Sequence, residues 1–261
     1  MRVTILGSGS SGGVPVVGLG WGACDPLNPK NRRTRPSVLM ETEGKTFLFD
    51  ASPDLRQQLL KAEVRHLDGI FFTHAHADHL NGLDDLRGIN RVMNSPLNIY
   101  CDAETLKAIQ ERFNYVLTPL PQNATRYYKP VLVPQTVRAG ELFEVSGGIQ
   151  IRVFDQDHGF SRTLGYRVGN FGYSTDVVNL PDAAFAELEG IHTWVLGCFS
   201  ELPHVTHVHV SKALEWIDII KPKYTVLMHL GPELDYTALS KKLPKGVVAA
   251  YDGISFEVPN Y

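Results

Sequence analysis

The segment 73–79, with the sequence Thr-His-Ala-His-Ala-Asp-His, limits the possible folds of this chain more than any other feature. It places four potential metal ligands within six consecutive residues: His74, His76, Asp78 and His79. Neutral imidazoles and ionised carboxylates are ligands that zinc, manganese and iron bind in proteins. The apolar run 69–72 before it predicts a buried strand, so the first two histidines project to the same side of an extended chain. We therefore expect a metal site at the end of a strand.

Three other apolar runs also end in residues of the ligand type. The run 149–154 leads to His158, the run 171–175 leads to Asp176, and the run 224–228 leads to His229. Because strands are rigid and the loops beyond them converge at one edge of a sheet, these residues can form a common site. Each one alone is weak evidence. A single histidine after a strand is commonly a hydrogen-bonded residue, and Asp176 by itself could be a helix N-cap.

The ordered set of these seven residues resembles the pattern of the metallo-β-lactamase superfamily, and the likeness extends over most of the chain. Periodicity alone predicts a mixed α/β chain; the resemblance implies a four-layer αββα sandwich. The implied ligands are His74, His76 and His158 for one metal, Asp78, His79 and His229 for a second, and Asp176 as a bridge. Asp50 and Asp252 are assigned a supporting role, as hydrogen-bond partners that orient the ligands.

Within the superfamily, three stretches resemble the phosphoribosyl cyclic phosphodiesterase (PhnP-like) group. They are the Gly-rich segment 7–15, the segment 21–24, and Thr206-His207 before the helix-like run 210–216. The resemblance implies that His207 lies beside the metals and assists catalysis. Cys24 stands alone where that group carries a cysteine cluster, so we expect no structural zinc.

The resemblance therefore implies a metal-dependent hydrolase with a dinuclear centre of manganese or zinc, with iron also compatible. We expect a phosphodiesterase that cleaves a small cyclic or nucleotide-like phosphodiester with a hydroxide bridging the metals. Such ions lower the pKa of a water from about 15.7 to near 7. His207, as general acid, and Asp78 are the predicted catalytic residues.

Three alternatives stay open. An ester or thioester hydrolase of the glyoxalase type would use the same hydroxide on a carbonyl. An RNA-processing nuclease is disfavoured, because the formal net charge is −3 and the sequence carries no long basic insertion. A non-enzymatic metal-binding partner in cofactor biosynthesis would not need His207, since a structural site is closed by its ligands.

Composition is compatible with one cytoplasmic enzyme. With 261 residues, of which 43% are hydrophobic, the chain can bury one large core, and we expect a single domain over residues 1–261. The sequence enters a strand at once and has no apolar run long enough to cross a membrane. The three cysteines, Cys24, Cys101 and Cys198, are widely separated, as is typical of reduced thiols. We expect no membrane partner; a homodimer is compatible with the sequence.

The apolar runs and turn residues also predict the secondary structure. Predicted strands are 3–6, 37–41, 46–50, 69–73, 142–145, 193–196, 224–228 and 254–258, in addition to the runs that lead to His158 and Asp176. Helical patterns occupy 54–61, 80–89, 104–115 and 210–216. The Pro-rich stretch 117–134 is either a loop near the site or an ordinary surface connection.

Two further motifs are tested against their context. Residues 7–12 spell GxGxxG after a strand, but residues 14–20 cannot open the helix that would hold a pyrophosphate, so a dinucleotide site is rejected. The basic segment 30–35 offers Arg32, Arg33 and Arg35 as candidate phosphate contacts, because a planar guanidinium group can bind phosphate through two hydrogen bonds. His204 is a further candidate substrate contact.

Overall fold

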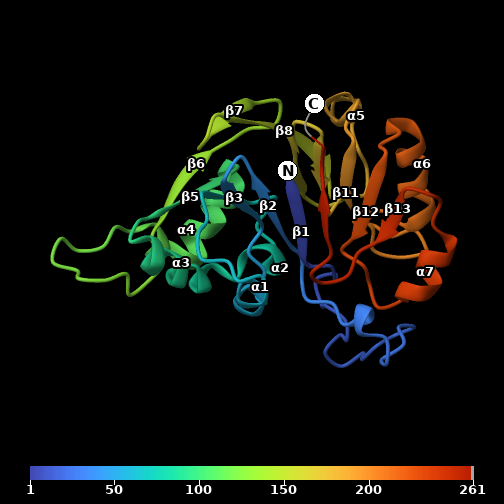
Figure 1. Ribbon diagram of the computed structural model, residues 1–261, viewed down its shortest axis with the longest axis horizontal. Coiled ribbons are helices and arrows are strands. Elements are labelled where there is room, and N and C mark those ends of the chain that lie inside the picture. The colour runs from blue at the N-terminus through green and yellow to red at the C-terminus, as the bar shows by residue number, and fades with distance from the viewer. Residues whose placement is uncertain (260–261) are drawn as a thin grey trace.

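The computed structural model describes residues 1–259. Within this range two seven-stranded sheets lie face to face (Figure 1). The first has the order β14 (Ser255–Glu257), β1 (Arg2–Gly7), β2 (Ser37–Thr42), β3 (Lys45–Phe49), β4 (Gly69–Phe71), β5 (Leu97–Cys101), β6 (Leu132–Thr136). The second has the order β13 (Val247–Ala249), β12 (Tyr224–Met228), β11 (Thr193–Gly197), β10 (Phe171–Ser174), β9 (Arg162–Val168), β8 (Ile149–Asp157), β7 (Leu142–Val145).

Helices cover the outer faces of both sheets, which confirms the predicted four-layer αββα sandwich (Figure 1). The first sheet carries α1 (Leu55–Lys61), α2 (Ala77–Leu80), α3 (Leu86–Met93) and α4 (Ala103–Leu117). The second carries α5 (Asp182–Leu188), α6 (Val210–Ile220) and α7 (Tyr236–Lys242). Two short 3₁₀ helices, η1 (Pro29–Asn31) and η2 (Leu83–Asp85), lie in connections. Every helix in the described range is too short or too polar to cross a bilayer.

Three apolar layers hold these four layers of structure together. Phe49, Phe71 and Tyr166 pack between the two sheets, with Phe49 and Tyr166 ring centroids 5.7 Å apart. Separate clusters fill the space between each sheet and its helices, around Leu55 on one side and Trp194 on the other. Strands covered on both faces need apolar residues at successive positions, and all five residues of β11 are buried. This explains why the strongest strand signals in the sequence are continuous apolar runs.

Strand direction brings the predicted ligands to one edge. β3, β4 and β5 run parallel to one another, and β10, β11 and β12 also form a parallel set. The carboxyl ends of parallel strands lie at the same edge of a sheet, where the following loops converge. The two sheets therefore present their loops to a shared rim.

The predicted strands are confirmed within one residue at each end, apart from 69–73, where β4 ends at Phe71, and 149–154, where β8 continues to Asp157. The helical run 80–89 is divided among α2, η2 and α3. Sequence reasoning missed β5, β6, β13, α5 and α7.

β6 begins within the Pro-rich stretch 117–134 and ends just after it. Pro134 is tolerated there because β6 is the edge strand of its sheet. The rest of that stretch, 118–131, projects from the left of Figure 1 and is held to α3 by Arg91 Nε, which donates to Tyr127 O at 2.6 Å. The stretch is therefore a surface connection.

Close packing of Gly165 in β9 against a buried ring can be tested by measuring the stability of a variant. A Cβ at this position would lie 2.0 Å from Phe154 Cε2, and that ring is itself buried. We expect Gly165→Ala to lower the free energy of unfolding by about 1–3 kcal/mol, because overpacked cores must shift to relieve a clash. Gly88→Ala in α3 is the control: its Cβ would meet no atom within 4 Å, and it should be neutral or stabilising by up to about 1 kcal/mol. Denaturant melts of both variants check this, and equal midpoints would contradict it.

Candidate metal centre

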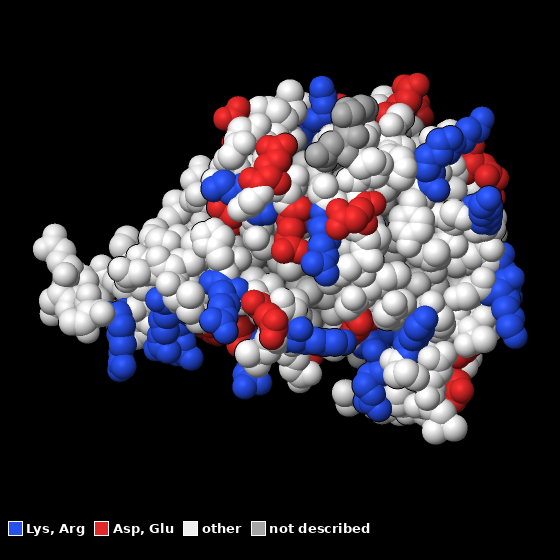
Figure 2. All heavy atoms as spheres, in the orientation of Figure 1, with Lys and Arg blue, Asp and Glu red and all other residues white. Residues whose placement is uncertain are grey.

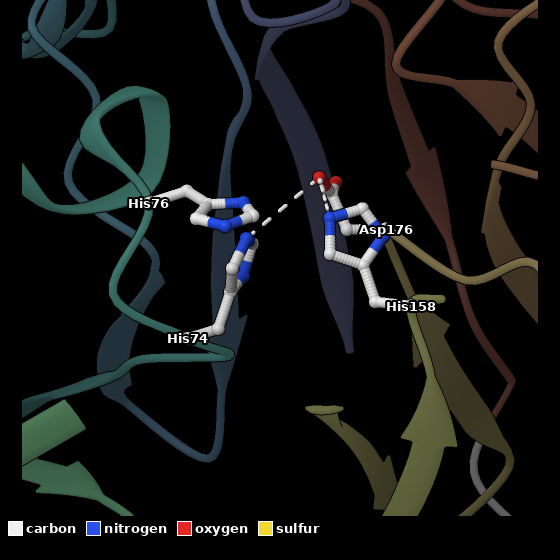
Figure 3. A group of neighbouring side chains, drawn as sticks. All are labelled: His74, His76, His158 and Asp176. Atoms are coloured by element: carbon white, nitrogen blue, oxygen red, sulfur yellow. Dashed lines mark ion pairs between the residues drawn. The ribbon is translucent and has the colours of Figure 1, made fainter. Parts of the chain in front are cut away.

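Seven side chains from both sheets converge at this shared rim, and Figure 3 shows four of them. Those that follow strand ends are His74 and His76 after β4, His158 after β8, Asp176 after β10, and His229 after β12; Asp78 and His79 lie in α2. In Figure 3, His74 and His76 approach from one side and His158 and Asp176 from the other. All seven are buried except His76, which is exposed. The structure thus brings together every residue in the predicted ligand set.

The seven residues form two groups that share Asp176. The first is His74, His76, His158 and Asp176, the second is Asp78, His79, Asp176 and His229, and in each group one atom per residue lies within 4.8 Å of the others. Asp176 Oδ2 is 3.8 Å from His74 Nε2 and 3.7 Å from His158 Nε2. Asp176 Oδ1 is 3.2 Å from both His79 Nε2 and His229 Nε2. One oxygen of the same carboxylate therefore faces each group.

The donor set fits divalent cations. Nε2 of His74 and Nε2 of His79 are buried and have no hydrogen-bond partner among the described residues. Buried polar atoms in proteins are almost always paired, so two unpaired nitrogens beside carboxylate oxygens indicate a missing positive partner. Histidine and aspartate together suit zinc, manganese or iron.

The electrostatics of the cluster favour the metal-binding protonation states. Burial, followed by the charge of His79, holds the pKa of the His74 imidazole well below its usual value, so this ring is neutral. Burial opposes ionisation of Asp176, but His229 and His79 outweigh it and the pKa of that carboxyl lies well below its usual value. Burial opposes protonation of His79 as well, but Asp176 and its carboxylate neighbours raise its pKa well above the usual value. A cation would replace that proton.

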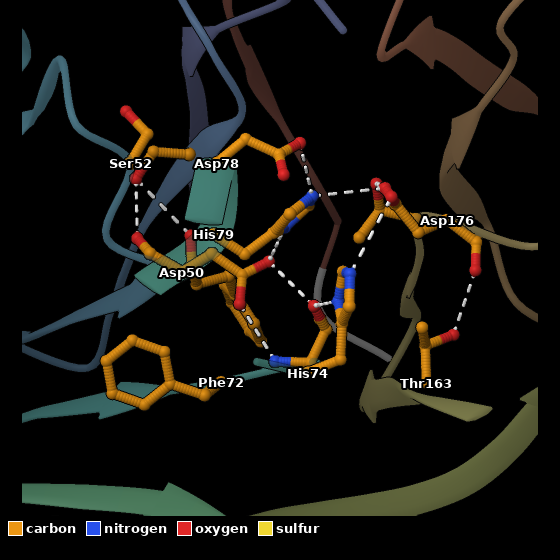
Figure 4. Close-up of polar contacts among 12 residues, drawn as sticks. Asp50, Ser52, Phe72, His74, Asp78, His79, Thr163 and Asp176 are labelled. Atoms are coloured by element: carbon orange, nitrogen blue, oxygen red, sulfur yellow. Dashed lines mark hydrogen bonds and ion pairs between the residues drawn. The ribbon is translucent and has the colours of Figure 1, made fainter. Parts of the chain in front are cut away.

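Hydrogen bonds behind three of the ligands, His74, His79 and His158, point Nε2 toward the centre, and Figure 4 shows those of His74 and His79. His79 Nδ1 lies 2.7 Å from Asp50 Oδ2, which also accepts the Thr73 hydroxyl at 2.9 Å. Because Thr73 Oγ1 donates to Asp50, it accepts from His74 Nδ1 at 3.0 Å. His158 Nδ1 donates to Thr206 O at 2.7 Å. Each ring is thus held in the tautomer that leaves Nε2 free for a cation.

The backbone is strained at three of the strand ends. Asp50, Asp176 and His229 have φ values of 59°, 50° and 58°. Residues other than glycine adopt this left-handed region at a cost of about 1–3 kcal/mol each, and they do so mostly at functional sites. Here the turn redirects the chain directly after β3, β10 and β12 and leaves the side chain at the sheet edge.

His207 comes from the loop between β11 and α6 and lies against this cluster. Its Nδ1 is 4.0 Å from Asp176 Oδ2, and its ring stacks on that of His229 with centroids 4.9 Å apart. Burial, followed by the charge of His229, lowers the pKa of His207 to about 3. The ring is therefore neutral at pH 7, and it can act as a general acid only when a bound anion raises that pKa.

Asp252 and Arg33 do not have the predicted roles. Asp252 accepts hydrogen bonds from the backbone and hydroxyl groups of Ser8 and Thr34, at 2.6–2.9 Å, so it ties the Gly-rich segment to the basic segment instead of orienting a ligand. Arg33 is buried, and its guanidinium donates to Gly231 O at 3.2 Å and Leu234 O at 2.7 Å. These carbonyls use the donors that a phosphate would need.

The remaining candidate substrate contacts are Arg35, Arg32 and His204, and each has different neighbours. Arg35 forms a two-point ion pair with Asp54, with Nε–Oδ2 and Nη2–Oδ1 distances of 2.8 Å. Arg32 stacks over the Trp21 ring at 5.0 Å. His204 is exposed, and its ring lies 5.3 Å from that of His207.

Sequence reasoning missed the contacts that hold the ligand loops from outside. Arg112 in α4 donates from Nη2 to Ala75 O, between His74 and His76, at 2.6 Å. Thr206 accepts from His158 across 48 residues of sequence. Both contacts join segments far apart in the chain, so no local pattern could have revealed them.

Residues 45–230 match the family described as the beta-lactamase superfamily domain. An octanoyltransferase from Porphyromonas gingivalis is 33% identical over 260 residues, which is 97% of this chain and 51% of that protein. A ribonuclease Z from Methanococcus maripaludis is 32% identical over 114 residues, which is 42% of this chain and 32% of that protein. The chain spans about half, or less, of the length of these curated relatives.

Two solved structures extend the comparison. A crystal structure described as a new diphosphatase from the PhnP family superposes with a TM-score of 0.90 and 30% identity, covering 99% of this chain and 98% of that one. Zn²⁺-bound PqqB from Methylobacterium extorquens gives a TM-score of 0.76 and 19% identity, covering 99% and 100%. The second likeness concerns the fold alone.

The shared carboxylate gives a direct test of the centre. We expect Asp176→Ala to lose or loosen both cations, because each group of ligands uses one of its oxygens. Metal per chain, measured on protein purified without chelator, checks this. Asp155→Ala removes a carboxylate of β8 that pairs with the exposed Arg162, and it should keep the wild-type metal content. An Asp176→Ala variant that retains two equivalents with full activity would exclude the bridging role.

Proposed function

Because this chain belongs to the metallo-β-lactamase superfamily and is close to the PhnP family, we propose that it is a dinuclear metal-dependent phosphodiesterase. The proposed substrate is a small cyclic or nucleotide-like phosphodiester. The observation that carries the proposal is the pair of ligand groups joined by Asp176. A closed structural site uses about four ligands, whereas seven residues with one shared carboxylate suit two cations that face a substrate.

Paired divalent cations, when bound, supply a water of lowered pKa and neutralise negative charge on a phosphoryl group. The chain contributes the ligands and fixes their direction. Asp50 and Thr73 set the tautomers of His79 and His74, and Thr206 O sets that of His158. His76, the one exposed ligand, marks the side from which a substrate can enter.

The names of two relatives support phosphoryl chemistry over other reactions. One is described as a diphosphatase and another as ribonuclease Z, and both names refer to cleavage of bonds between phosphorus and oxygen. A large polyanion is a poor fit for this chain, whose formal net charge is −3. In Figure 2, acidic and basic side chains are mixed over the upper part of the face, whereas basic ones predominate along the lower edge. A small phosphoric ester or anhydride is the substrate class that meets both conditions.

His207 is the proposed proton donor to the leaving group. Its ring lies against His229 and beside Asp176, within the cluster, and burial keeps it neutral at pH 7. A phosphoryl anion next to the imidazole would favour its charged form and raise its pKa toward neutrality. The proton would then pass to the departing alkoxide, as general acid catalysis requires.

A second candidate is hydrolysis of an acyl ester or thioester. It is favoured by the octanoyltransferase relative, whose name refers to acyl transfer and half of whose length this chain matches. The same ligand set can serve attack on a carbonyl carbon, so the geometry of the centre does not separate the two reactions. Preference for a phosphodiester or for an acyl ester must therefore come from the leaving group and from the shape of the surrounding loops.

A substrate comparison separates the candidates. We expect protein reconstituted with manganese or zinc to hydrolyse a chromogenic phosphodiester faster than a thioester, and to lose this activity when a chelator removes the metal. A diphosphate ester belongs in the same assay. Faster hydrolysis of the thioester with every metal would overturn the phosphodiesterase proposal, and no hydrolysis with any metal would favour a non-enzymatic role.

The role of His207 as general acid can be tested by comparing substrates that differ in their leaving group. We expect His207→Ala to keep both metals but to lose about 10²–10⁴ in turnover on an alkyl leaving group, the usual range for general acid catalysis. The loss should be smaller for a nitrophenolate, which departs without a proton. His66→Ala, which removes an exposed histidine paired with Asp68 at 3.2 Å, is the control. Equal losses on both leaving groups would mean that His207 positions the substrate instead.

A further inference from the structure

Three large apolar side chains are exposed on two loops beside the candidate metal centre. Phe160, in the turn between β8 and β9, is 89% exposed. Leu202 and Val205, in the loop between β11 and α6, are 75% and 68% exposed. We call these three residues the apolar rim. Exposed apolar side chains that cluster at a site commonly mark a binding surface.

The two loops of the apolar rim touch each other through their backbones. A Cβ on Gly159 would lie 2.6 Å from Val205 O and 3.1 Å from Thr206 Cγ2. Only glycine permits this approach, and its φ of +77° also requires glycine. Phe160 and Val205 are therefore neighbours in space although they lie far apart in the sequence.

Both loops are also fixed to the metal ligands. His158 Nδ1 donates to Thr206 O at 2.7 Å, and Phe160 N donates to His158 O at 3.0 Å. Phe160 follows the ligand His158 by two positions, and Val205 precedes His207 by two. A molecule held at the metal centre thus lies next to the apolar rim.

A row of packed rings leads from the ligand His229 into the loop that carries Leu202 and Val205. The His207 ring lies over the ligand His229 with centroids 4.9 Å apart and an interplanar angle of 25°. His204 continues the series, 5.3 Å from His207 at 32°, and Phe199 packs 4.9 Å from His204. Ring faces are largely apolar, so this row of rings suits an apolar or planar group.

We propose that the apolar rim binds an apolar substituent of the substrate, either an alkyl chain or a planar ring, while the reacting group lies at the metal centre. The inference rests on the proposed function, because it assigns a substrate class to the same site. Removal of apolar surface from water favours such binding. The position of the apolar rim favours a substrate group as its occupant, since the same two loops carry His158 and His207.

Turnover of matched substrates tests this inference. The p-nitrophenyl esters of methyl-, hexyl- and phenylphosphonate share one leaving group and differ only in the substituent on phosphorus. We expect wild-type kcat/KM to be about tenfold higher for the larger substituents than for methyl, a typical discrimination for apolar contacts. Phe160→Ser with Val205→Ser should bring the ratio near one by lowering kcat/KM for the hexyl and phenyl esters more than for the methyl ester.

The control variant is Val92→Ser in α3. Val92 is 66% exposed, close to the 68% of Val205, so the same substitution is made at equal exposure on another surface. Its substituent preference should match that of the wild type. Equal losses on all three esters in the double variant, or no preference in the wild type, would overturn the inference. Val205→Thr, which keeps the shape of the side chain, should lower the preference in the same direction if the double variant does not fold.

Binding provides a readout that does not depend on turnover. Calorimetric titration of metal-loaded protein with methyl-, hexyl- and phenylphosphonate should show tighter binding of the larger ligands, and the hexyl and phenyl titrations distinguish a chain from a ring. Equal affinity for all three would overturn the inference. If the preference in binding stands but none of the esters is hydrolysed, the proposed function fails while the apolar rim remains a binding site.

Sedimentation tests whether a second copy of this chain, instead of a substrate group, covers the apolar rim. We expect the wild type and the double variant to have the same mass in solution. A wild-type dimer that becomes monomeric in Phe160→Ser with Val205→Ser would show that the apolar rim is a self-interface, and would overturn the inference.

Discussion

The carboxylate of Asp176 is the interaction on which the rest of the site depends. It is buried, and its two oxygens face different groups of histidines, with Oδ1 3.2 Å from His79 Nε2 and Oδ2 3.7 Å from His158 Nε2. A buried charge must be matched by opposite charge and hydrogen bonds, or the cost of removing it from water is not offset. A protonated His79 can match part of this charge, and bound cations would match it at both oxygens.

The sandwich architecture makes such a cluster possible. The first sheet supplies β4 with its two following histidines, and the second supplies β8, β10 and β12. Only the face-to-face packing of the two sheets, through rings such as Phe49 and Tyr173 with centroids 5.0 Å apart, brings these strand ends together. The rigid core also maintains the left-handed backbone of Asp176 and His229, which a flexible loop would relax.

The surroundings of the centre determine which substrate it accepts. Proteins similar to this chain are described as a diphosphatase, a ribonuclease Z and an octanoyltransferase, so similarity to this family does not by itself select the reaction. In this chain the loops next to His158 and His207 carry exposed apolar residues, whereas the arginines near the Gly-rich segment are used in structural contacts. Selection by an apolar substituent follows from that distribution.

The sequence by itself determined most of the strands and the candidate ligands, because these depend on local periodicity and on residue chemistry at strand ends, and the ordered set of ligands implied the four-layer class through the family resemblance. The motif at His74 to His79 and the runs before His158, Asp176 and His229 are all readable within short windows. Tertiary structure alone decided how the charged side chains are used. Arg33 is satisfied by carbonyl groups 198 and 201 residues away, and Asp252 by groups 218 and 244 residues away. A sequence shows that a charge is present, but its partner is set by which distant backbone groups the packed sheets bring within hydrogen-bonding distance.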